Sequence, residues 1–181
     1  MLQTITKFTF RNEVMSRGFV KEDDQEEAPV IPPRAALPAG ITNYVTPAGE
    51  RELLQEKKDL EEERKNRDGE SETELRRQAT VIDGKMNLLN ERISSARIIQ
   101  LSEQPENEVR FGALVKFKMN GNTQEFQIVG VDQADVKKKK IAFVAPIAKA
   151  LTGNKVGGKT EFNLGAETRT IEVLAIDYPS E

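Results

Sequence analysis

The segment VRFGALVKFKMNGNTQEFQIVGV, residues 109–131, decides the fold of the second half of this chain. Apolar side chains stand at every second position from Val109 to Met119, which is the spacing of a strand with one buried face. Asn120 and Gly121 follow, and this pair favours a two-residue turn between antiparallel strands. QEFQIVGV then predicts the returning strand, so the sequence indicates a β-hairpin.

The residues after this hairpin continue the sheet and add one short helix. The further predicted strands are KKIAFVA (139–145), GGKTEFNL (157–164) and TRTIEVLAIDY (168–178). Pro146 is placed to begin a short helix that Gly153 ends. We therefore expect an α+β fold in which residues 103–181 form a small antiparallel sheet with one helix.

Residues 44–102 contain two helical patterns separated by a short break. Thr46 is a suitable N-cap for the first helix, and Pro47 suits its first position. The apolar residues of the second helix follow a heptad spacing, at Leu75, Ala79, Ile82, Met86, Leu89, Ile93 and Ala96. Because the break is short, the helices must run antiparallel. We expect a coiled-coil hairpin whose second helix, through residue 99, is about 40 Å long.

The break itself, RKNRDGESETELRR, holds most of the candidate functional residues. Gly69 is expected to end the first helix in the left-handed conformation, and Ser71 with Glu74 forms a capping box for the second. Exposed carboxylates on a rigid arm could complete a Mg²⁺ site in a partner, because Mg²⁺ takes one or two carboxylates plus water and phosphate. The simpler alternative is an acidic helix start that complements the helix dipole. The candidate metal ligands, near a tip at about residues 66–72, are Asp68, Glu70 and Glu72, and the flanking basic residues are Arg64, Lys65, Arg67, Arg76 and Arg77.

Residues 1–43 read as a disordered or extended tail, because KEDDQEEAPVIPPRAALPAG joins an acidic run to four prolines. The alternative is a strap along the protein or along a partner, anchored by Phe8, Phe10 and Phe19. Met15 opens a segment that resembles an alternative start.

The composition excludes large classes of enzymes. The chain has 181 residues with no His and no Cys, so it offers no histidine base and no imidazole or thiolate ligand for zinc or iron. A net charge of −3 gives no reason to expect nucleic acid as the main partner. No apolar run reaches the roughly 18 residues of a membrane span, and the N-terminus lacks the apolar segment of a signal peptide. We expect a cytoplasmic protein that is not an enzyme and holds no cofactor of its own.

From about Tyr44 to Tyr178 the chain resembles the bacterial GreA/GreB transcription elongation factors. The matching segments are TPAGERELLQE, VIDGKMNLLNERISSARII, VRFGALVKF, FQIVGVDQADVKKKKIAFVAPIAKALTGNKVGGK and IEVLAIDY. The resemblance implies an antiparallel coiled coil followed by an FKBP-like domain. It further implies that this domain docks at the rim of the secondary channel of RNA polymerase while the coil enters the channel.

The resemblance also implies roles for individual residues. The acidic tip would help to hold a catalytic Mg²⁺ of the polymerase, which then cleaves backtracked RNA, and the basic flank would contact RNA or the channel wall. The implied docking residues are Asp132, Ala145, Pro146 and Ile147. At the level of the family, the resemblance adds contact with nascent RNA and DNA binding, and we expect a monomer.

Two departures from the family pattern leave the cleavage role open. Gly69, Glu70, Ser71 and Glu72 match the family tip only if one residue between the two acids is missing. The two helices together are also shorter by about two heptads, which withdraws the tip by roughly 10 Å at about 1.5 Å per residue. The alternative is a protein that occupies the channel without stimulating cleavage, like the related regulator of nucleoside diphosphate kinase.

Two hypotheses lie outside transcription. One is a peptidyl-prolyl isomerase, which needs an aromatic-lined pocket. The aromatic residues available for such a pocket are Phe111, Phe117, Phe126, Phe143, Phe162 and Tyr178. The other is a helical-hairpin adaptor with no role in transcription.

Overall fold

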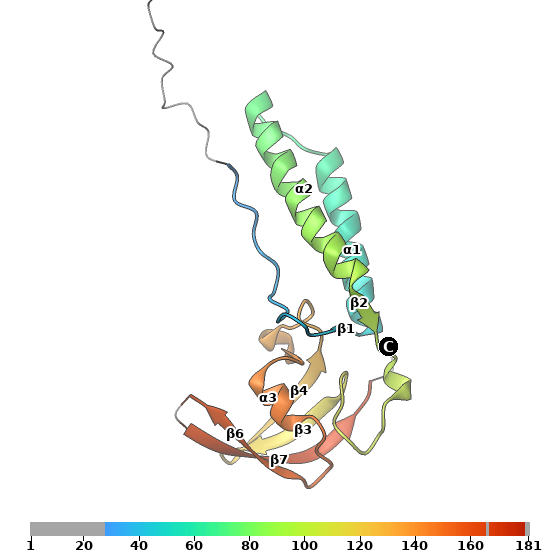
Figure 1. Ribbon diagram of the computed structural model, residues 1–181, viewed down its shortest axis with the longest axis vertical. Helices are drawn as coiled ribbons and strands as arrows, with labels where there is room; N and C mark the ends of the chain where they lie inside the picture. Colours follow the sequence, from blue (N-terminus) through green and yellow to red (C-terminus); the bar gives the residue numbers. More distant parts are fainter. Residues whose placement is uncertain (1–27, 166, 180–181) are drawn as a thin grey trace, which may run out of the picture.

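The computed structural model describes residues 28–165 and 167–179, and it shows a helical hairpin that projects from a curled sheet (Figure 1). The mixed α+β class expected from the sequence is confirmed. Within the described part of the chain, no helix combines the length and the apolar character needed to cross a membrane. Phe8, Phe10, Met15 and Phe19 lie outside the described residues.

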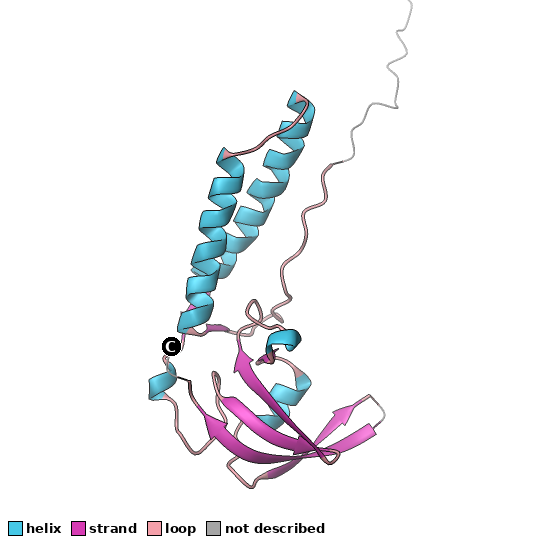
Figure 2. Ribbon diagram, turned by 180° about the vertical axis from the view of Figure 1, so that it is seen from behind, coloured by secondary structure: helices cyan, strands magenta, loops and turns pink. Residues whose placement is uncertain are grey.

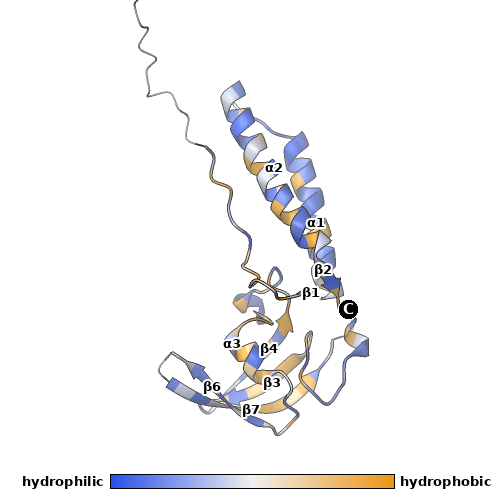
Figure 3. Ribbon diagram, in the orientation of Figure 1, coloured by the Kyte–Doolittle hydropathy of each residue, from blue (hydrophilic) through white to orange (hydrophobic). Residues whose placement is uncertain are grey.

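Two helices, α1 (Pro47–Lys65) and α2 (Glu72–Ser94), lie side by side in the hairpin (Figure 1). Thr46 caps α1 as predicted, because its Oγ1 accepts a hydrogen bond from the Gly49 N–H at 2.9 Å. Both helices are mostly hydrophilic (Figure 3), so a narrow apolar seam pairs them. The buried side chains of this seam are Leu53, Leu60, Ile82 and Leu89, next to Val45 at its base.

The second helix is shorter than predicted. It ends at Ser94 after 23 residues, which is about 35 Å at about 1.5 Å per residue. Ala96–Ile98 instead forms β2, which pairs in parallel with β1 (Asn43–Val45). The Asn43 side chain donates a hydrogen bond to the Arg92 carbonyl at 2.9 Å, so this neighbouring segment satisfies the end of the helix. The pairing of β2 with β1, two strands far apart in the sequence, ends α2 although its apolar spacing continues.

The first helix also ends earlier than predicted. Its last residue is Lys65, and the backbone N–H of Asn66 closes the final turn on the Glu62 carbonyl at 2.9 Å. Gly69 is not among the glycines with positive φ, so the expected left-handed helix end at this residue was wrong. Asn66 completes the last turn before the chain reaches the glycine.

Five strands form the sheet of the C-terminal domain, in the order β5-β4-β3-β7-β6. They are β3 (Leu114–Met119), β4 (Asn122–Val129), β5 (Lys140–Ala142), β6 (Lys159–Leu164) and β7 (Glu167–Asp177). Asn120 and Gly121 have φ angles of 49° and 80°, as the predicted two-residue turn between β3 and β4 requires. The helix α3 (Pro146–Leu151) lies beside the curled sheet (Figure 2), and Leu151 joins Phe117 and Ile171 in its core.

One strand pair departs from the predicted antiparallel sheet. β5 runs parallel to β4, with Ile141 opposite Ile128. The connection passes through a short 3-10 helix, Val136–Lys138, and then through Lys139 in the left-handed conformation at φ 55°. These turns bring the chain back beside β4 in the same direction, so the sheet is mixed.

Residues 28–42, which we call the strap, contain no helix or strand and descend beside α2 to reach β1 (Figure 1). Ile31 lies against Gly84 in the middle of α2, and the Arg92 guanidinium donates to the Ala35 carbonyl at 2.6 Å. The strap therefore follows the protein itself over these residues, which is one of the two readings that the sequence left open.

Candidate functional site

The loop that joins α1 to α2 presents two exposed acidic residues, Asp68 and Glu70. The Gln78 side chain donates to the Asp68 carbonyl at 3.0 Å, which ties the loop backbone to α2. Ser71 Oγ accepts a hydrogen bond from the Glu74 N–H at 3.2 Å, as the capping box predicts. The tip is thus a turn held by side chain to backbone contacts, with its acids directed to solvent.

The other two tip acids are already engaged. Glu74 Oε2 accepts from the Glu70 N–H at 3.3 Å, one residue before the position that a capping box usually serves. Glu72 forms an ion pair with Arg76, and both side chains are more than 70% exposed, at 81% and 74%. An exposed pair of this kind contributes little stability, so Glu72 can exchange Arg76 for another partner at small cost.

The number of carboxylates that come together decides which kind of metal site the tip acids could form. Across residues 28–165 and 167–179, no three acidic residues come close enough together to hold a metal ion. Mg²⁺ requires only one or two protein carboxylates when water and phosphate complete its shell. Asp68 and Glu70 could supply that number, and the partner would supply the rest.

The basic residues of the tip surround the same loop. Arg64 forms an ion pair with Asp83 of α2, with 2.7 Å between Nε and Oδ1, and so links the two helices near their free end. Arg67 is partly buried, and its Nε has no hydrogen-bond partner among the described residues. The remaining candidates, Lys65, Arg76 and Arg77, are exposed. The tip therefore presents both signs of charge.

The four residues that the resemblance assigns to docking lie in two different settings. Ala145 and Pro146 begin α3, and Pro146 is exposed. Ile147 is partly buried and packs against the core of the sheet. Asp132 lies after β4 at the base of the hairpin, and its side chain is only 11% exposed. Pro146 is open to a partner, whereas Asp132 is covered.

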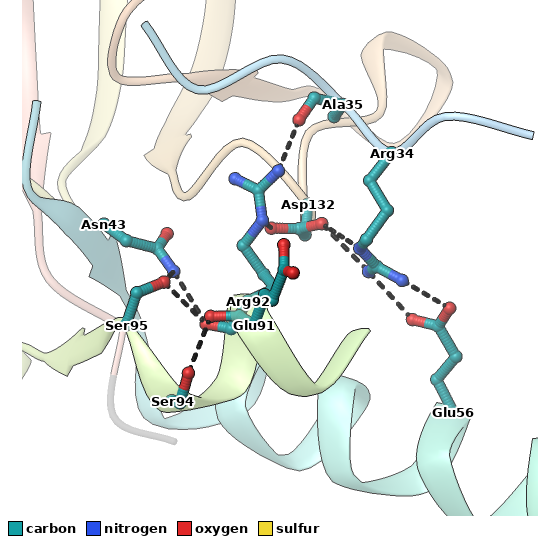
Figure 4. A network of polar contacts seen from close by, with 9 residues as sticks. All are labelled: Arg34, Ala35, Asn43, Glu56, Glu91, Arg92, Ser94, Ser95 and Asp132. Carbon is teal, nitrogen blue, oxygen red and sulfur yellow. Dashed lines mark hydrogen bonds and ion pairs between the residues drawn. The ribbon is translucent and has the colours of Figure 1, made fainter. Parts of the chain in front are cut away.

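Asp132 is covered by two arginines that the sequence did not single out (Figure 4). Arg34 of the strap lies 3.0 Å from Asp132 Oδ1 through Nε, and it also makes two hydrogen bonds to Glu56, at 2.7 and 3.0 Å. Arg92 of α2 places its Nε 3.2 Å from Asp132 Oδ2. The hydrogen bond with Glu56 raises the pKa of Arg34, Asp132 raises it further, and burial opposes both, so Arg34 remains charged.

No local pattern could have identified this group of charges. Arg34 is a single cation in a proline-rich segment, and it lies 98 residues from Asp132 in the sequence. Glu56 and Arg92 stand on hydrophilic faces of their helices, where charged residues are common. Only the packing of the strap against the base of the hairpin brings them together.

The fold places the aromatic residues considered for an isomerase pocket in separate parts of the protein. Phe117 and Phe162 are buried in the core of the sheet and cannot line an open pocket. Phe111 and Phe143 meet edge to face, with ring centroids 5.7 Å apart, and Tyr44 of β1 packs against both. This cluster joins the hairpin base to the sheet, so we assign it a structural role.

Comparisons with known proteins identify relatives of this chain, chiefly through its C-terminal domain. Residues 104–178 match the family model "Transcription elongation factor, GreA/GreB, C-term". Transcription elongation factor GreA of Sinorhizobium medicae is 36% identical over 98 residues, which are 53% of this chain and 62% of the relative. GreA of Thermodesulfovibrio yellowstonii is 34% identical over 106 residues, which are 57% of this chain and 66% of the relative. The chain thus spans a little under two thirds of these curated relatives.

Two solved structures give weaker overall likenesses. The crystal structure of GreA factor homolog 1 (Gfh1) of Thermus thermophilus is 22% identical with a TM-score of 0.35, and the alignment covers 76% of this chain and 99% of that one. The GreA/GreB factor of Nitrosomonas europaea is 17% identical with a TM-score of 0.37, and the alignment covers 75% and 98%. By its sequence, the C-terminal domain of this chain, residues 104–178, belongs to the GreA/GreB family.

Proposed function

We propose that this protein binds bacterial RNA polymerase and modulates transcript elongation, with its helical hairpin entering the secondary channel. The observation that carries the proposal is the match of residues 104–178 to the GreA/GreB C-terminal domain, joined to a hairpin with a charged, exposed tip. The finer description belongs to the same proposal: the hairpin acts as an antiparallel coiled coil, and the C-terminal domain is FKBP-like. In this role the polymerase performs the chemistry.

The proposed docking face is the start of α3. Pro146 is exposed there beside the partly buried Ala145 and Ile147, and Lys149 follows on the same short helix. A small apolar centre with a charged edge is the usual composition of a specific protein interface. Equilibrium titration of labelled protein with RNA polymerase tests the proposal, and the absence of saturable binding at micromolar concentrations would refute it.

Within this proposal, Asp68 and Glu70 would offer carboxylates to the polymerase's Mg²⁺, which would supply Lewis-acid assistance for hydrolysis of the transcript. Glu72 could add a third oxygen ligand after it releases Arg76. The ordered turn at the tip would keep these side chains in place, because the Asp68 carbonyl is held by Gln78.

A transcript-cleavage assay on stalled elongation complexes separates the two versions of the proposal. If the tip completes the metal site, wild-type protein shortens the transcript, whereas Glu70→Gln and Glu72→Ala abolish shortening without loss of binding. Glu50→Gln, an exposed acid in the first turn of α1 at the opposite end of the hairpin, is the matched control and keeps activity. If wild-type protein binds but leaves the transcript intact, it is a non-cleaving regulator of the channel.

The length of the hairpin is the observation that favours the non-cleaving version. α1 and α2 have 19 and 23 residues, so at about 1.5 Å per residue the hairpin extends only about 30–35 Å from its base. Metal–oxygen bonds to Mg²⁺ are only about 2 Å long, so even a modest shortfall in reach prevents coordination. In that version the tip occupies the channel and limits access to it.

A further inference from the structure

The strap, residues 28–42, makes its contacts at the junction between the hairpin and the C-terminal domain. Arg34 joins Glu56 of α1 to Asp132 of the C-terminal domain, and Arg92 of α2 joins the same Asp132 to the Ala35 carbonyl (Figure 4). The four interacting segments are thus the strap, both helices and the loop after β4. Two of these segments belong to the hairpin, one is the strap and one belongs to the C-terminal domain.

These charges are shielded from solvent. The side chains of Arg34, Arg92 and Asp132 are 17%, 12% and 11% exposed, whereas Glu56 is 44% exposed. Ion pairs with little access to water are screened less than surface pairs, and two parallel hydrogen bonds fix the guanidinium plane against Glu56. The geometry therefore constrains direction as well as distance between the segments.

Gly84 provides independent evidence for the position of the strap against α2. A Cβ at this position would stand 2.3 Å from Ile31 Cδ1, so the glycine lets the Ile31 side chain lie directly on the helix, and a larger residue would push it aside. Glycine in the middle of a helix is unfavourable relative to alanine. α2 thus carries an unfavourable residue at the point where the strap crosses it.

Further hydrogen bonds join the start of the hairpin to the C-terminal domain. Thr46 Oγ1 donates to Gln133 Oε1 at 2.9 Å, and Glu52 accepts from Gln133 and from Lys140, each at 3.3 Å. These contacts all lie at the α1 side of the hairpin. Arg92 ties α2 directly to Asp132, and the strap adds the Arg34 bridge between Asp132 and Glu56 of α1.

We infer that the strap is a clamp that fixes the direction of the helical hairpin relative to the C-terminal domain, with Arg34 as its positioning residue. This goes beyond the proposed function, because it concerns the free protein and holds whether or not the protein binds polymerase. Loss of the clamp should leave both parts folded and allow the hairpin to swing about β1 and β2.

Distance measurement between two spin labels tests the clamp in the full-length protein. The chain has no Cys, so Glu61→Cys on α1 and Glu161→Cys on β6, both exposed, give two unique labelling sites. With Arg34 present, we expect one narrow distance distribution. Arg34→Gln should shift and widen it, because glutamine cannot bridge Glu56 and Asp132.

Two further variants make the test specific. Arg64→Gln removes an ion pair within the hairpin and should leave the distribution unchanged. Gly84→Leu strengthens α2 by its helix propensity and fills the space of the Ile31 side chain, so it should raise hairpin stability, displace the strap and still widen the distribution. A role of the strap in hairpin stability alone predicts no widening in this variant.

The inference is overturned if Arg34→Gln and Gly84→Leu both give the narrow distribution of the parent protein. Should Arg34→Gln lose its helical circular dichroism, Gly84→Leu decides the question by itself. Because no polymerase is present, this result is independent of the binding experiment that tests the proposed function.

Discussion

At the scale of single residues, Tyr178 shows how one side chain closes the C-terminal domain. Its hydroxyl donates to the Glu108 carbonyl at 2.7 Å and accepts from the Arg110 N–H at 2.9 Å. The hydroxyl thus fastens the end of the chain that follows β7 to the segment that precedes β3. Burial raises the pKa of Tyr178 above its ordinary value near 10, although the Arg110 hydrogen bond opposes the shift.

Tyr178→Phe should lower the free energy of unfolding by about 1 kcal/mol at neutral pH, because two backbone groups lose their partner. The folded protein favours the protonated phenol, so this contribution is present below pH 10 and is lost as the pH rises through the raised pKa. The stability difference between wild type and variant should therefore narrow at alkaline pH, as measured by urea unfolding. Tyr44→Phe is the control, and equal alkaline losses in Tyr178→Phe and wild type would contradict this account.

Asp132 illustrates a residue whose setting changes its expected role. The resemblance assigns it to docking, yet its carboxylate lies between Arg34 and Arg92 (Figure 4). A carboxylate so placed attracts a partner only after Arg34 has moved. In any one conformation, Asp132 can therefore hold the clamp or contact a partner, but it cannot do both.

At the scale of elements, the hairpin depends on a seam that is one residue wide on α1. Leu53 is buried at 4% exposure in this seam, and its neighbour Leu54 is 43% exposed. Two chemically identical side chains thus stand on the inner and outer faces of the same helix. The inner one contributes packing, while the outer one contributes little beyond helix propensity.

Leu53→Ala should destabilise the hairpin by about 2–5 kcal/mol, because it leaves a cavity between α1 and α2. Leu54→Ala should change the stability by no more than about 0.5 kcal/mol, as is usual for exposed positions. Thermal unfolding followed by helical circular dichroism provides the comparison. Similar losses for the two variants would show that the apolar seam does not hold the helices together.

Local patterns predicted most of the elements. The Thr46 cap, the capping box at Ser71 and the turn at Asn120 are all confirmed, because each depends on neighbours within a few residues. Ile82 and Leu89, two of the heptad positions, are buried as predicted.

Some errors lie where distant segments compete with local preference, whereas the early end of α1 at Lys65 has a local cause. α2 stops at Ser94 because β2 pairs with β1, and β5 runs parallel to β4 because of the turns that precede it. The charges around Asp132 were missed for the same reason, since Arg34 is 98 residues away. The tip residues follow directly from the sequence, while the junction residues require the fold.

At the scale of the whole molecule, the protein is a stiff arm attached at one end to a compact sheet domain (Figure 2). The proposed function needs both parts: α3 to dock, and the tip to reach into a channel. The strap would set the angle between them before docking occurs. If a partner binds only the sheet domain, the clamp alone would set the angle between the hairpin and that domain.

The measurement that tests the central claim most directly is an equilibrium titration of RNA polymerase with fluorescently labelled wild type, Pro146→Asp and Pro105→Asp. Pro146 and Pro105 are both exposed, but only Pro146 begins α3. We predict saturable binding of wild type and Pro105→Asp with equal affinity, and at least about tenfold weaker binding of Pro146→Asp, because a charge at the apolar centre of the interface must be desolvated. No binding by the wild type would contradict the account as a whole, and equal affinity of all three would contradict docking through α3.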